Sequence, residues 1–250
     1  CRPIRRYHHH ETGMLNYTEG GEVDRADCSL VIPAYNEERR IRSVLEDISG
    51  FAGDLIFVCD GTDATPAIIG AFAADHPSLS IRCLTFPVRL GKGGGIVAGV
   101  REASTPYVGY MDADGSTSLW EMERLFDRLA DADGAIGSRW LPGSVLTVRQ
   151  GLRRRAESRF FNLLVRLLFG LDYRDTQCGA KAFRREALDR VLPSIRSTGF
   201  EFDVELLWRL ARSGCRVEEV PITWENRDES KVGASDAKEM LLGMIRLRFG

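Results

Sequence analysis

Acidic side chains follow three of the short apolar runs in the sequence, at the points where those runs end. Glu37 follows the first run, Asp60 ends the second, and Asp112 and Asp114 lie at the end of the fourth. The carboxyl ends of parallel strands meet at one edge of a sheet, so these carboxylates are expected to converge. Unneutralised, they would raise one another's pKa, and a bound divalent cation would relieve that repulsion.

The pair Asp112 and Asp114 is the strongest candidate for seating such a cation. With a diphosphate supplying further oxygen ligands, two carboxylates and water suffice for Mg²⁺ or Mn²⁺. Taken alone, Asp112–Gly115 (DADG) is also typical of a surface turn. Its place directly after an apolar strand, beside two other acidic strand ends, favours the metal site.

The run Gly91–Gly95, which contains Lys92, suggests a phosphate loop. It is not a Walker A loop, because no Ser or Thr follows the lysine. The pattern over Gly93–Ala98 matches a dinucleotide-binding fingerprint, with Asp112 as the later acidic residue, but that fingerprint belongs to the first strand–helix turn and this run follows the third strand. A helix start packed closely on the sheet is the alternative, and a nicotinamide-dependent oxidoreductase stays open as a different class of function.

The elements that must position these residues alternate between strands and helices. This alternation predicts an α/β fold with a mostly parallel, Rossmann-like sheet flanked by helices. The expected strands are Cys28–Pro33, Asp54–Asp60, Ser80–Phe86, Tyr107–Asp112 and Gly134–Ser138. The expected helices between them are Glu37–Ile48, Ala64–Ala74, Lys92–Glu102 and Leu119–Ala130. Ser118 and Glu121 predict a capping box at the start of the last of these helices.

The second half of the chain has a more varied pattern. It predicts a basic amphipathic helix over Arg149–Gly170, strands over Gln177–Phe183 and Arg216–Trp224, and helices over Arg184–Leu192, Phe202–Ser213 and Asp236–Phe249. We expect one domain over residues 28–250, in which 28–139 form a nucleotide-binding half and 140–250 an acceptor-side half. Residues 1–27 are expected to form a mobile leader.

The segment Arg149–Gly170 could contact a membrane. Arginines interleaved with Phe and Leu suit a helix lying in an anionic headgroup layer. The alternative is a helix whose apolar side is core and whose arginines are solvated or paired. The final helix, Asp236–Phe249, has a similar make-up and is expected at an interface or against the domain.

The composition of the chain limits which other classes of protein it could belong to. The 250 residues carry 34 Lys and Arg against 36 Asp and Glu, a net charge of −2, so no overall field recruits nucleic acid. The six cysteines form no C-x-x-C pattern, which indicates reduced, mostly buried thiols in a cytoplasmic protein. No apolar stretch approaches the roughly 18 residues needed to span a bilayer, so any membrane contact of this cytoplasmic protein is expected to be peripheral, at the cytosolic face.

Several segments together resemble the family 2 glycosyltransferases of GT-A fold, and most closely the dolichyl-phosphate β-glucosyltransferases and other polyprenyl-phosphate glycosyltransferases. The resemblance runs from about residue 28 to 249. The segments that carry it are Val31–Glu38, Gly91–Gly94, Asp112–Gly115, Gly137–Arg139, Asp175–Lys181, Phe202–Leu207 and Trp224 with Arg227, Ser230 and Lys231.

The resemblance implies roles for individual residues. Nucleotide-sugar binding would fall to Pro33, Ala34, Tyr35, Glu37, Asp60, Lys92, Asp112, Ala113, Asp114 and Arg139, with Asp60 on the base and Glu37 near the ribose. Phosphate oxygens of donor and acceptor would meet Arg139, Arg154, Arg227 and Lys231, and Asp112, Asp114, Arg154 and Lys231 would be catalytic. Asp175, Gln177 and Asp203 could orient the sugar or these cations, although an ion pair would explain Asp175 and Asp203 equally well. Cys59 and Ala180 depart from the usual pattern, which has an acidic residue and an aromatic residue at these positions.

The implied reaction is a metal-dependent, inverting transfer of a hexose, with glucose favoured, from a UDP-sugar to dolichyl or polyprenyl phosphate. A metal would neutralise charge on the leaving diphosphate. The lipid phosphate is mostly dianionic at pH 7 and needs no general base. The alternatives are a GDP-mannose or UDP-N-acetylglucosamine enzyme of the same kind, and a non-catalytic nucleotide-sugar binder.

Overall fold

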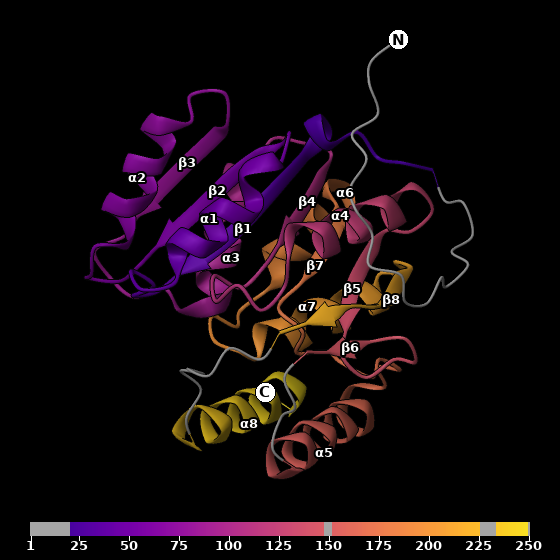
Figure 1. Ribbon diagram of the computed structural model, residues 1–250. Helices are drawn as coiled ribbons and strands as arrows, with labels where there is room; N and C mark the ends of the chain where they lie inside the picture. Colours follow the sequence, from indigo (N-terminus) through magenta and orange to yellow (C-terminus); the bar gives the residue numbers. More distant parts are fainter. Residues whose placement is uncertain (1–20, 148–151, 226–233, 250) are drawn as a thin grey trace.

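The structure is a computed structural model of the 250-residue chain and describes residues 21–147, 152–225 and 234–249, with side chains described over 21–147, 161–225 and 242–249. A seven-stranded sheet forms its centre, in the order β3-β2-β1-β4-β7-β5-β8 (Figure 1). All neighbouring strands are parallel except β7, which is antiparallel to β4 and β5. The strands are β1 (Cys28–Ala34), β2 (Asp54–Cys59), β3 (Ser80–Thr85), β4 (Tyr107–Tyr110), β5 (Gly134–Ser138), β7 (Lys181–Arg184) and β8 (Val217–Pro221).

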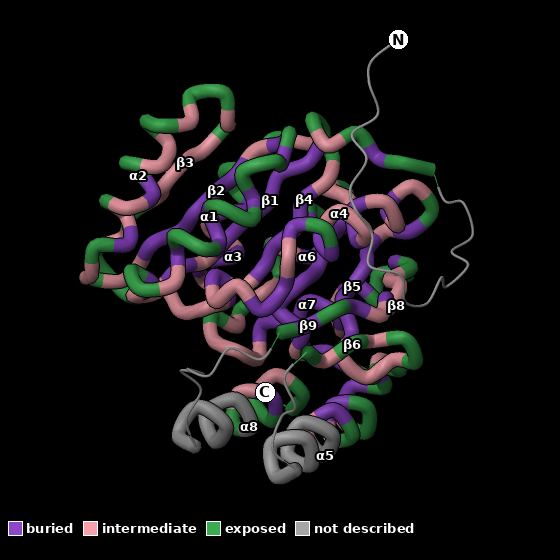
Figure 2. Tube along the Cα trace, in the orientation of Figure 1, coloured by how far each residue is buried: buried purple, intermediate pink, exposed green. Residues whose placement is uncertain are grey.

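Successive side chains of a strand point to opposite faces of the sheet. The strands here carry apolar side chains on both faces, and helices cover both faces and bury them. Leu30 and Ile32 of β1 pack into one core, and Val31 packs into the other. The first core includes residues of α1 (Ile41–Asp47), α2 (Thr65–Asp75) and α4 (Leu119–Asp127). The second includes residues of α3 (Gly91–Glu102), α5 (Leu152–Phe169), α6 (Arg185–Val191), α7 (Phe202–Arg212) and α8 (Ala234–Phe249). Figure 2 shows the central strands as the most continuously buried part of the chain.

Four short 3₁₀ helices and two short strands complete the described elements. They are η1 (Arg25–Asp27), η2 (Ile48–Gly50), η3 (Arg128–Ala130), η4 (Leu192–Ser194), β6 (Val145–Leu146) and β9 (Thr223–Trp224). The α/β fold with a mostly parallel sheet is therefore confirmed. The strand expected over Arg216–Trp224 is instead divided between β8 and β9, which joins β6 in a separate two-stranded sheet. The division falls at Pro221, which has no backbone N–H to donate to a ladder.

The capping box expected at the start of α4 is wrong. The Ser118 side chain makes no capping hydrogen bond, and Asp47 Oδ2 accepts instead from the backbone N–H of Leu119 at 2.7 Å. Glu121 is fully buried, pairs with Arg124 at 2.5 Å and accepts from the Thr223 N–H at 2.8 Å. Partners from distant parts of the chain thus replace the local cap.

The described end of the expected leader, residues 21–27, packs on the domain. Val23 is buried, and its N–H donates to Asp127 Oδ1 at 3.3 Å. Arg25 pairs with the same carboxylate at 2.8 Å. These contacts attach the segment before β1 to α4, whereas residues 1–20 lie outside the described part of the chain.

Candidate active site

The carboxyl ends of β1, β2 and β4 lie at one edge of the sheet. Ala34 is opposite Cys59 across the β1–β2 pair, and Val31 is opposite Tyr110 across the β1–β4 pair. The loops that leave these strands therefore bring the expected nucleotide-binding residues to the same edge (Figure 1). Pro33 is half-buried and Ala34 is buried at the end of β1.

Asp112 and Asp114 leave the end of β4 as expected, on either side of the buried Ala113. The Asp112 side chain is 39% exposed, and Asp114 is half-buried. Asp114 Oδ1 accepts from the Ser116 N–H at 2.9 Å, so the DADG turn also forms. Among the described residues no three His, Cys, Asp or Glu side chains gather as metal ligands. Two accessible carboxylates fit a Mg²⁺ or Mn²⁺ ion that takes its other ligands from a diphosphate and water.

Lys92 lies between Asp112 and a second carboxylate, Asp203. Its Nζ atom is 3.0 Å from Asp112 Oδ1 and 3.2 Å from Asp203 Oδ2. The second contact is an ion pair without good hydrogen-bond geometry. The other oxygen of this carboxylate, Asp203 Oδ1, accepts hydrogen bonds from Lys181 Nζ at 2.6 Å and from the Tyr110 hydroxyl at 2.7 Å.

This cluster holds its charges despite burial. Burial alone would lower the pKa of Lys92, but Asp112 and Asp203 outweigh that effect and raise it above the ordinary lysine value. Burial likewise opposes ionisation of Asp203, and Lys181 and Lys92 outweigh it and lower the pKa of that carboxyl. Two lysines therefore neutralise two carboxylates at this edge.

Arg139, at the end of β5, is held by Asp175. Its Nε and Nη2 atoms donate to the two carboxylate oxygens at 2.7 Å and 2.9 Å, and its backbone N–H donates at 3.0 Å. Burial opposes the charge on Asp175, but Arg139 outweighs it and lowers the pKa of the carboxyl. Of the two explanations left open for Asp175, its fully buried contacts favour the ion pair that orients Arg139.

The loop after β1 is fixed by contacts with its neighbours. The Arg89 guanidinium lies 4.1 Å from the ring centroid of Tyr35, and Glu37 pairs with Arg40 at 2.6 Å. The Glu37 N–H donates to Thr65 Oγ1 at 2.8 Å. These contacts place Tyr35 and Glu37 before any ligand binds.

Asp60, expected on the base, has one oxygen engaged at the start of α3. Its Oδ2 atom accepts from the N–H groups of Leu90 and Gly91 at 2.8 Å and 3.2 Å. Cys59, which precedes it, is buried in the core beneath the edge. Cys59 stands where the family pattern has an acidic residue, and in this chain the position is therefore filled by a side chain that packs in the core.

The expected acceptor-side residues are only partly described. Arg154 lies on α5 with its side chain outside the described set, and Arg227 and Lys231 fall in segments outside it. Gln177 is half-buried, and its amide nitrogen is a buried donor that finds no partner within the described residues. Ala180 is fully buried in the core.

Sequence reasoning gave no role to three residues that shape the site: Tyr110, Lys181 and Gly179. A lysine at the head of an apolar strand, as in Lys181-Ala182-Phe183, is a usable signal, because buried lysines need a carboxylate partner. A Cβ atom on Gly179 would overlap the Asp112 carboxylate, so only glycine leaves that carboxylate its place. No pattern in the sequence identifies that close approach.

The glycine run at the start of α3 is explained by close packing. A Cβ on Gly93 would lie 2.5 Å from Phe202 Cβ, and one on Gly95 would lie 3.3 Å from Pro33 Cβ. Gly91 has a φ of +75°, which favours glycine. The packed helix start is therefore what the structure contains, and the dinucleotide fingerprint is not needed to explain these glycines.

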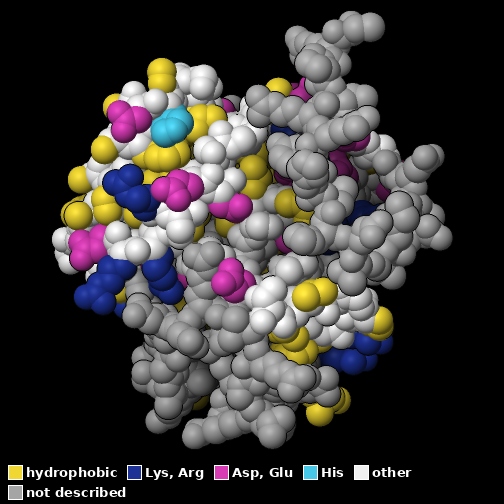
Figure 3. Space-filling view, in the orientation of Figure 1, with side chains coloured by type: hydrophobic (Ala, Val, Ile, Leu, Met, Phe, Trp, Pro, Cys, Tyr) yellow, Lys and Arg dark blue, Asp and Glu magenta, His cyan; other side chains and the backbone are white. Residues whose placement is uncertain are grey.

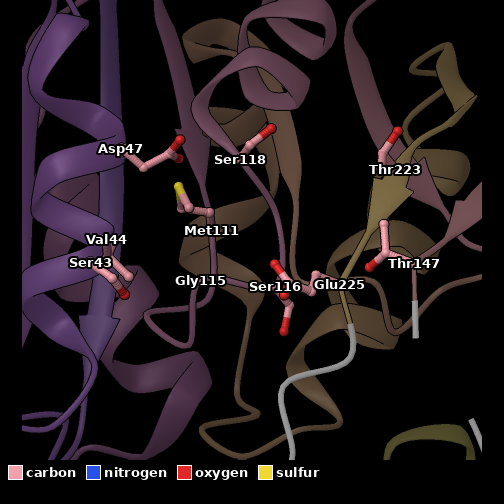
Figure 4. A pocket seen from close by; sticks show the side chains of 10 residues that line it. All are labelled: Ser43, Val44, Asp47, Met111, Gly115, Ser116, Ser118, Thr147, Thr223 and Glu225. Carbon is pink, nitrogen blue, oxygen red and sulfur yellow. The ribbon is translucent and has the colours of Figure 1, made fainter. Parts of the chain in front are cut away.

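A hollow of about 240 Å³ adjoins the Asp114 turn on the α1 side (Figure 4). Its lining includes the hydroxyl-bearing residues Ser116, Ser118, Thr147 and Thr223, together with the acidic residues Asp47 and Glu225. Because carboxylates accept hydrogen bonds from hydroxyl groups and repel anions, this hollow fits a hydroxyl-bearing group better than an anion.

A family model described as "Glycosyl transferase family 2" matches residues 29–192, which include the edge described above. The chain belongs to glycosyltransferase family 2. The match spans the loops after β1, β2 and β4 and the Arg139–Asp175 pair. The resemblance stated from the motifs is therefore confirmed at the level of the family.

Three curated relatives illustrate the similarity of this family 2 glycosyltransferase. Glycosyltransferase AglD of Haloferax volcanii is 36% identical over 87% of this chain, which spans 36% of that relative's length. A dolichyl-phosphate beta-glucosyltransferase of Dictyostelium discoideum is 30% identical over 91% of this chain and 75% of its own. A polyprenol monophosphomannose synthase of Mycolicibacterium smegmatis is 34% identical over 85% of this chain and 83% of its own.

Solved structures show the same fold. A glucosyl-3-phosphoglycerate synthase from Mycobacterium tuberculosis, crystallised with Mn²⁺, UDP-glucose and phosphoglyceric acid, superposes with a TM-score of 0.68 at 19% identity, covering 94% of this chain and 85% of that one. The GT-A type of this glycosyltransferase fold is thereby confirmed.

Proposed function

We propose that this glycosyltransferase transfers a hexose, with glucose favoured, from a UDP-sugar to dolichyl or another polyprenyl phosphate, with inversion at the anomeric carbon. The observation that carries the proposal is the similarity, along 91% of the chain, to a relative named a dolichyl-phosphate beta-glucosyltransferase. The mannose synthase among the relatives supports the same acceptor class and keeps GDP-mannose as the alternative donor.

The donor would bind along the edge of the sheet. Pro33, Tyr35, Glu37 and Asp60 would hold the nucleoside, and Asp112 and Asp114 would hold Mg²⁺ or Mn²⁺. When bound, the metal supplies positive charge to the leaving diphosphate. Lys92 and Arg139 lie at the same edge, each in an ion pair with a carboxylate. The Gln177 amide nitrogen, which has no partner within the described residues, is proposed to donate to a sugar hydroxyl.

The acceptor would need orientation rather than deprotonation. A phosphate monoester has a second pKa of about 6 and is mostly dianionic at pH 7, so its oxygen is already a nucleophile. Arginine can bridge two phosphate oxygens, and Asp175 presets the plane of the Arg139 guanidinium for such a contact. Arg154, Arg227 and Lys231 are proposed to complete this role. A single in-line displacement converts an α-linked donor into a β-linked product.

The acceptor's lipid requires contact with a membrane surface, and α5 and α8 are proposed to make it. Over the described residues no helix is long and apolar enough to cross a bilayer. The two helices are joined where Arg248 Nε donates to the Leu168 carbonyl at 2.8 Å. Over the described side chains of these helices, 161–169 and 242–249, the exposed large hydrophobic residues are Leu163, Leu167, Leu242, Ile245 and Phe249. Figure 3 shows hydrophobic and basic side chains together at the lower right, where Figure 1 places the described end of α5.

A panel of labelled donors tests the proposal. UDP-glucose, UDP-N-acetylglucosamine and GDP-mannose are each offered with a polyprenyl phosphate, with and without EDTA. We expect lipid-linked label from UDP-glucose, lost with EDTA. Label from GDP-mannose alone would overturn the donor assignment. UDP binding in calorimetry without transfer from any donor would favour a non-catalytic binder.

A further inference from the structure

Asp203 is the fixed centre of the charged cluster beneath the donor edge. It is fully buried, as are its partners Lys181 and Tyr110, both of which contact Oδ1. Lys181 is itself anchored, because its Nζ atom also donates to the Cys178 carbonyl. With Oδ1 held by two buried donors, Oδ2 faces Lys92.

Asp203 has no surface to offer a ligand. Its exposed fraction is 0%, whereas Lys92 is 12% and Asp112 39% exposed. Exposure therefore rises in one direction, from Asp203 through Lys92 to Asp112. Lys92 contacts both Asp203 and Asp112 and therefore links the buried carboxylate directly to the exposed one.

The backbone around Lys92 is equally constrained. A Cβ on Gly91 would lie 2.5 Å from the Thr198 carbonyl oxygen, and one on Gly93 would lie 2.5 Å from Phe202 Cβ. The glycines on both sides of Lys92 thus let α3 approach the segment that leads into α7. That approach brings Lys92 within reach of Asp203, the second residue of α7.

We propose that Asp203 is a positioning residue that holds Lys92 against Asp112 and so fixes the Asp112 carboxylate for the donor. The inference rests on the proposed function for the identity of the donor. Of the roles left open for Asp203, which were to orient the sugar, to orient a cation or to form a structural ion pair, it favours orienting a cation. It also gives the glycine run Gly91–Gly94 a role, which is to present Lys92 between two carboxylates.

A double-mutant cycle tests this assignment. UDP affinity in the presence of Mg²⁺ is measured by calorimetry for Asp203→Asn, Lys92→Met and the double variant, and KM values are measured for donor and acceptor. We expect Asp203→Asn to weaken UDP binding by about 10- to 100-fold, the usual cost of losing an outer partner of a ligating group. The donor KM should rise while the acceptor KM stays unchanged. The double variant should bind UDP no more weakly than Lys92→Met alone.

Additive losses in the cycle would overturn the inference, because Asp203 would then act independently of Lys92. Glu121→Gln is the matched control, since Glu121 is equally buried and paired with an arginine on α4. It should lower the melting temperature and leave UDP affinity unchanged. If Asp203→Asn does not fold, Asp203→Ser, which also removes the carboxylate that faces Lys92, takes its place in the cycle and is judged by the same criterion.

A crystal structure of Asp203→Asn, or of Asp203→Ser in its place, separates this inference from the proposed function, because it needs no donor. We expect Lys92 Nζ to move away from residue 203 and the Asp112 carboxylate to shift from its wild-type position against Gly179. An unchanged position of the Asp112 carboxylate would overturn the positioning role. Absence of both UDP binding and sugar transfer in the wild-type protein would overturn the proposed function instead.

Discussion

Gly179 lies directly against the carboxylate of Asp112. A Cβ atom at position 179 would overlap Asp112 Oδ2 and would lie 2.9 Å from Oδ1. Lys92 holds the same carboxylate at 3.0 Å from another direction. The position of the Asp112 carboxylate therefore depends on the absence of a side chain at Gly179 as well as on the positive charge of Lys92.

Replacing Gly179 by Ala should displace Asp112 and reduce activity. A shift of about 1 Å at a catalytic group can cost on the order of 100-fold in rate, and overpacking should cost about 1–3 kcal/mol of stability. Transfer assays and urea unfolding measure the two effects. Gly70→Ala on α2 is the control, because nothing lies within 4 Å of its added Cβ. Wild-type activity in Gly179→Ala would contradict the packing role of Gly179.

Stability should fall in acid because of Asp175 and Asp203. Both carboxyls have a pKa below the ordinary value of about 3.9 in the fold. The ionised carboxylates contribute to the free energy of unfolding when the pH is above their ordinary pKa. This contribution is lost as the pH falls through the lower pKa that they have in the folded protein. Urea unfolding of wild type and Asp175→Asn from pH 6 to 3 measures this. The variant should be less stable at pH 6 and lose less on acidification, and parallel curves would contradict the assignment.

Much of the fold could be predicted from the sequence because the strands are continuous apolar runs that end in polar residues. The edge containing Asp112 and Asp114 follows from that pattern alone. The pairing of Lys92 with Asp203, and of Arg139 with Asp175, could not be predicted, because nothing local in the sequence specifies partners so far apart. The same limit explains the start of α4, where Asp47 replaces the expected Ser118 cap.

Cysteine reactivity should single out Cys83. Its hydrogen bond with Cys59, at an Sγ–Sγ distance of 3.8 Å, lowers the pKa of Cys83 and raises that of Cys59. Burial raises the pKa of Cys28 and of Cys178 to about 12 each. At pH 7.5 iodoacetamide should therefore label Cys83 first among the five described cysteines, as followed by mass spectrometry. Faster labelling of Cys28 or Cys178 would refute this order.

Binding to vesicles should depend on the exposed side chains of α5 and α8. Leu167 and Phe249 are about three-quarters exposed, and charging both should reduce binding to anionic vesicles by about tenfold or more. Cosedimentation of Leu167→Glu/Phe249→Glu with vesicles measures the loss. Trp120→Glu is the control, an exposed hydrophobic residue on α4. Equal loss in the control would contradict a membrane-facing role for α5 and α8.

The most direct test of the account is transfer of labelled glucose from UDP-glucose to dolichyl phosphate by the wild-type protein and by Asp114→Asn. We predict β-linked lipid product from the wild type in Mg²⁺ or Mn²⁺, none with EDTA, and a loss of about 100-fold or more in a folded Asp114→Asn variant. Full activity of that variant in metal-replete buffer would contradict the metal site, and no lipid-linked glucose from the wild type would contradict the proposed reaction.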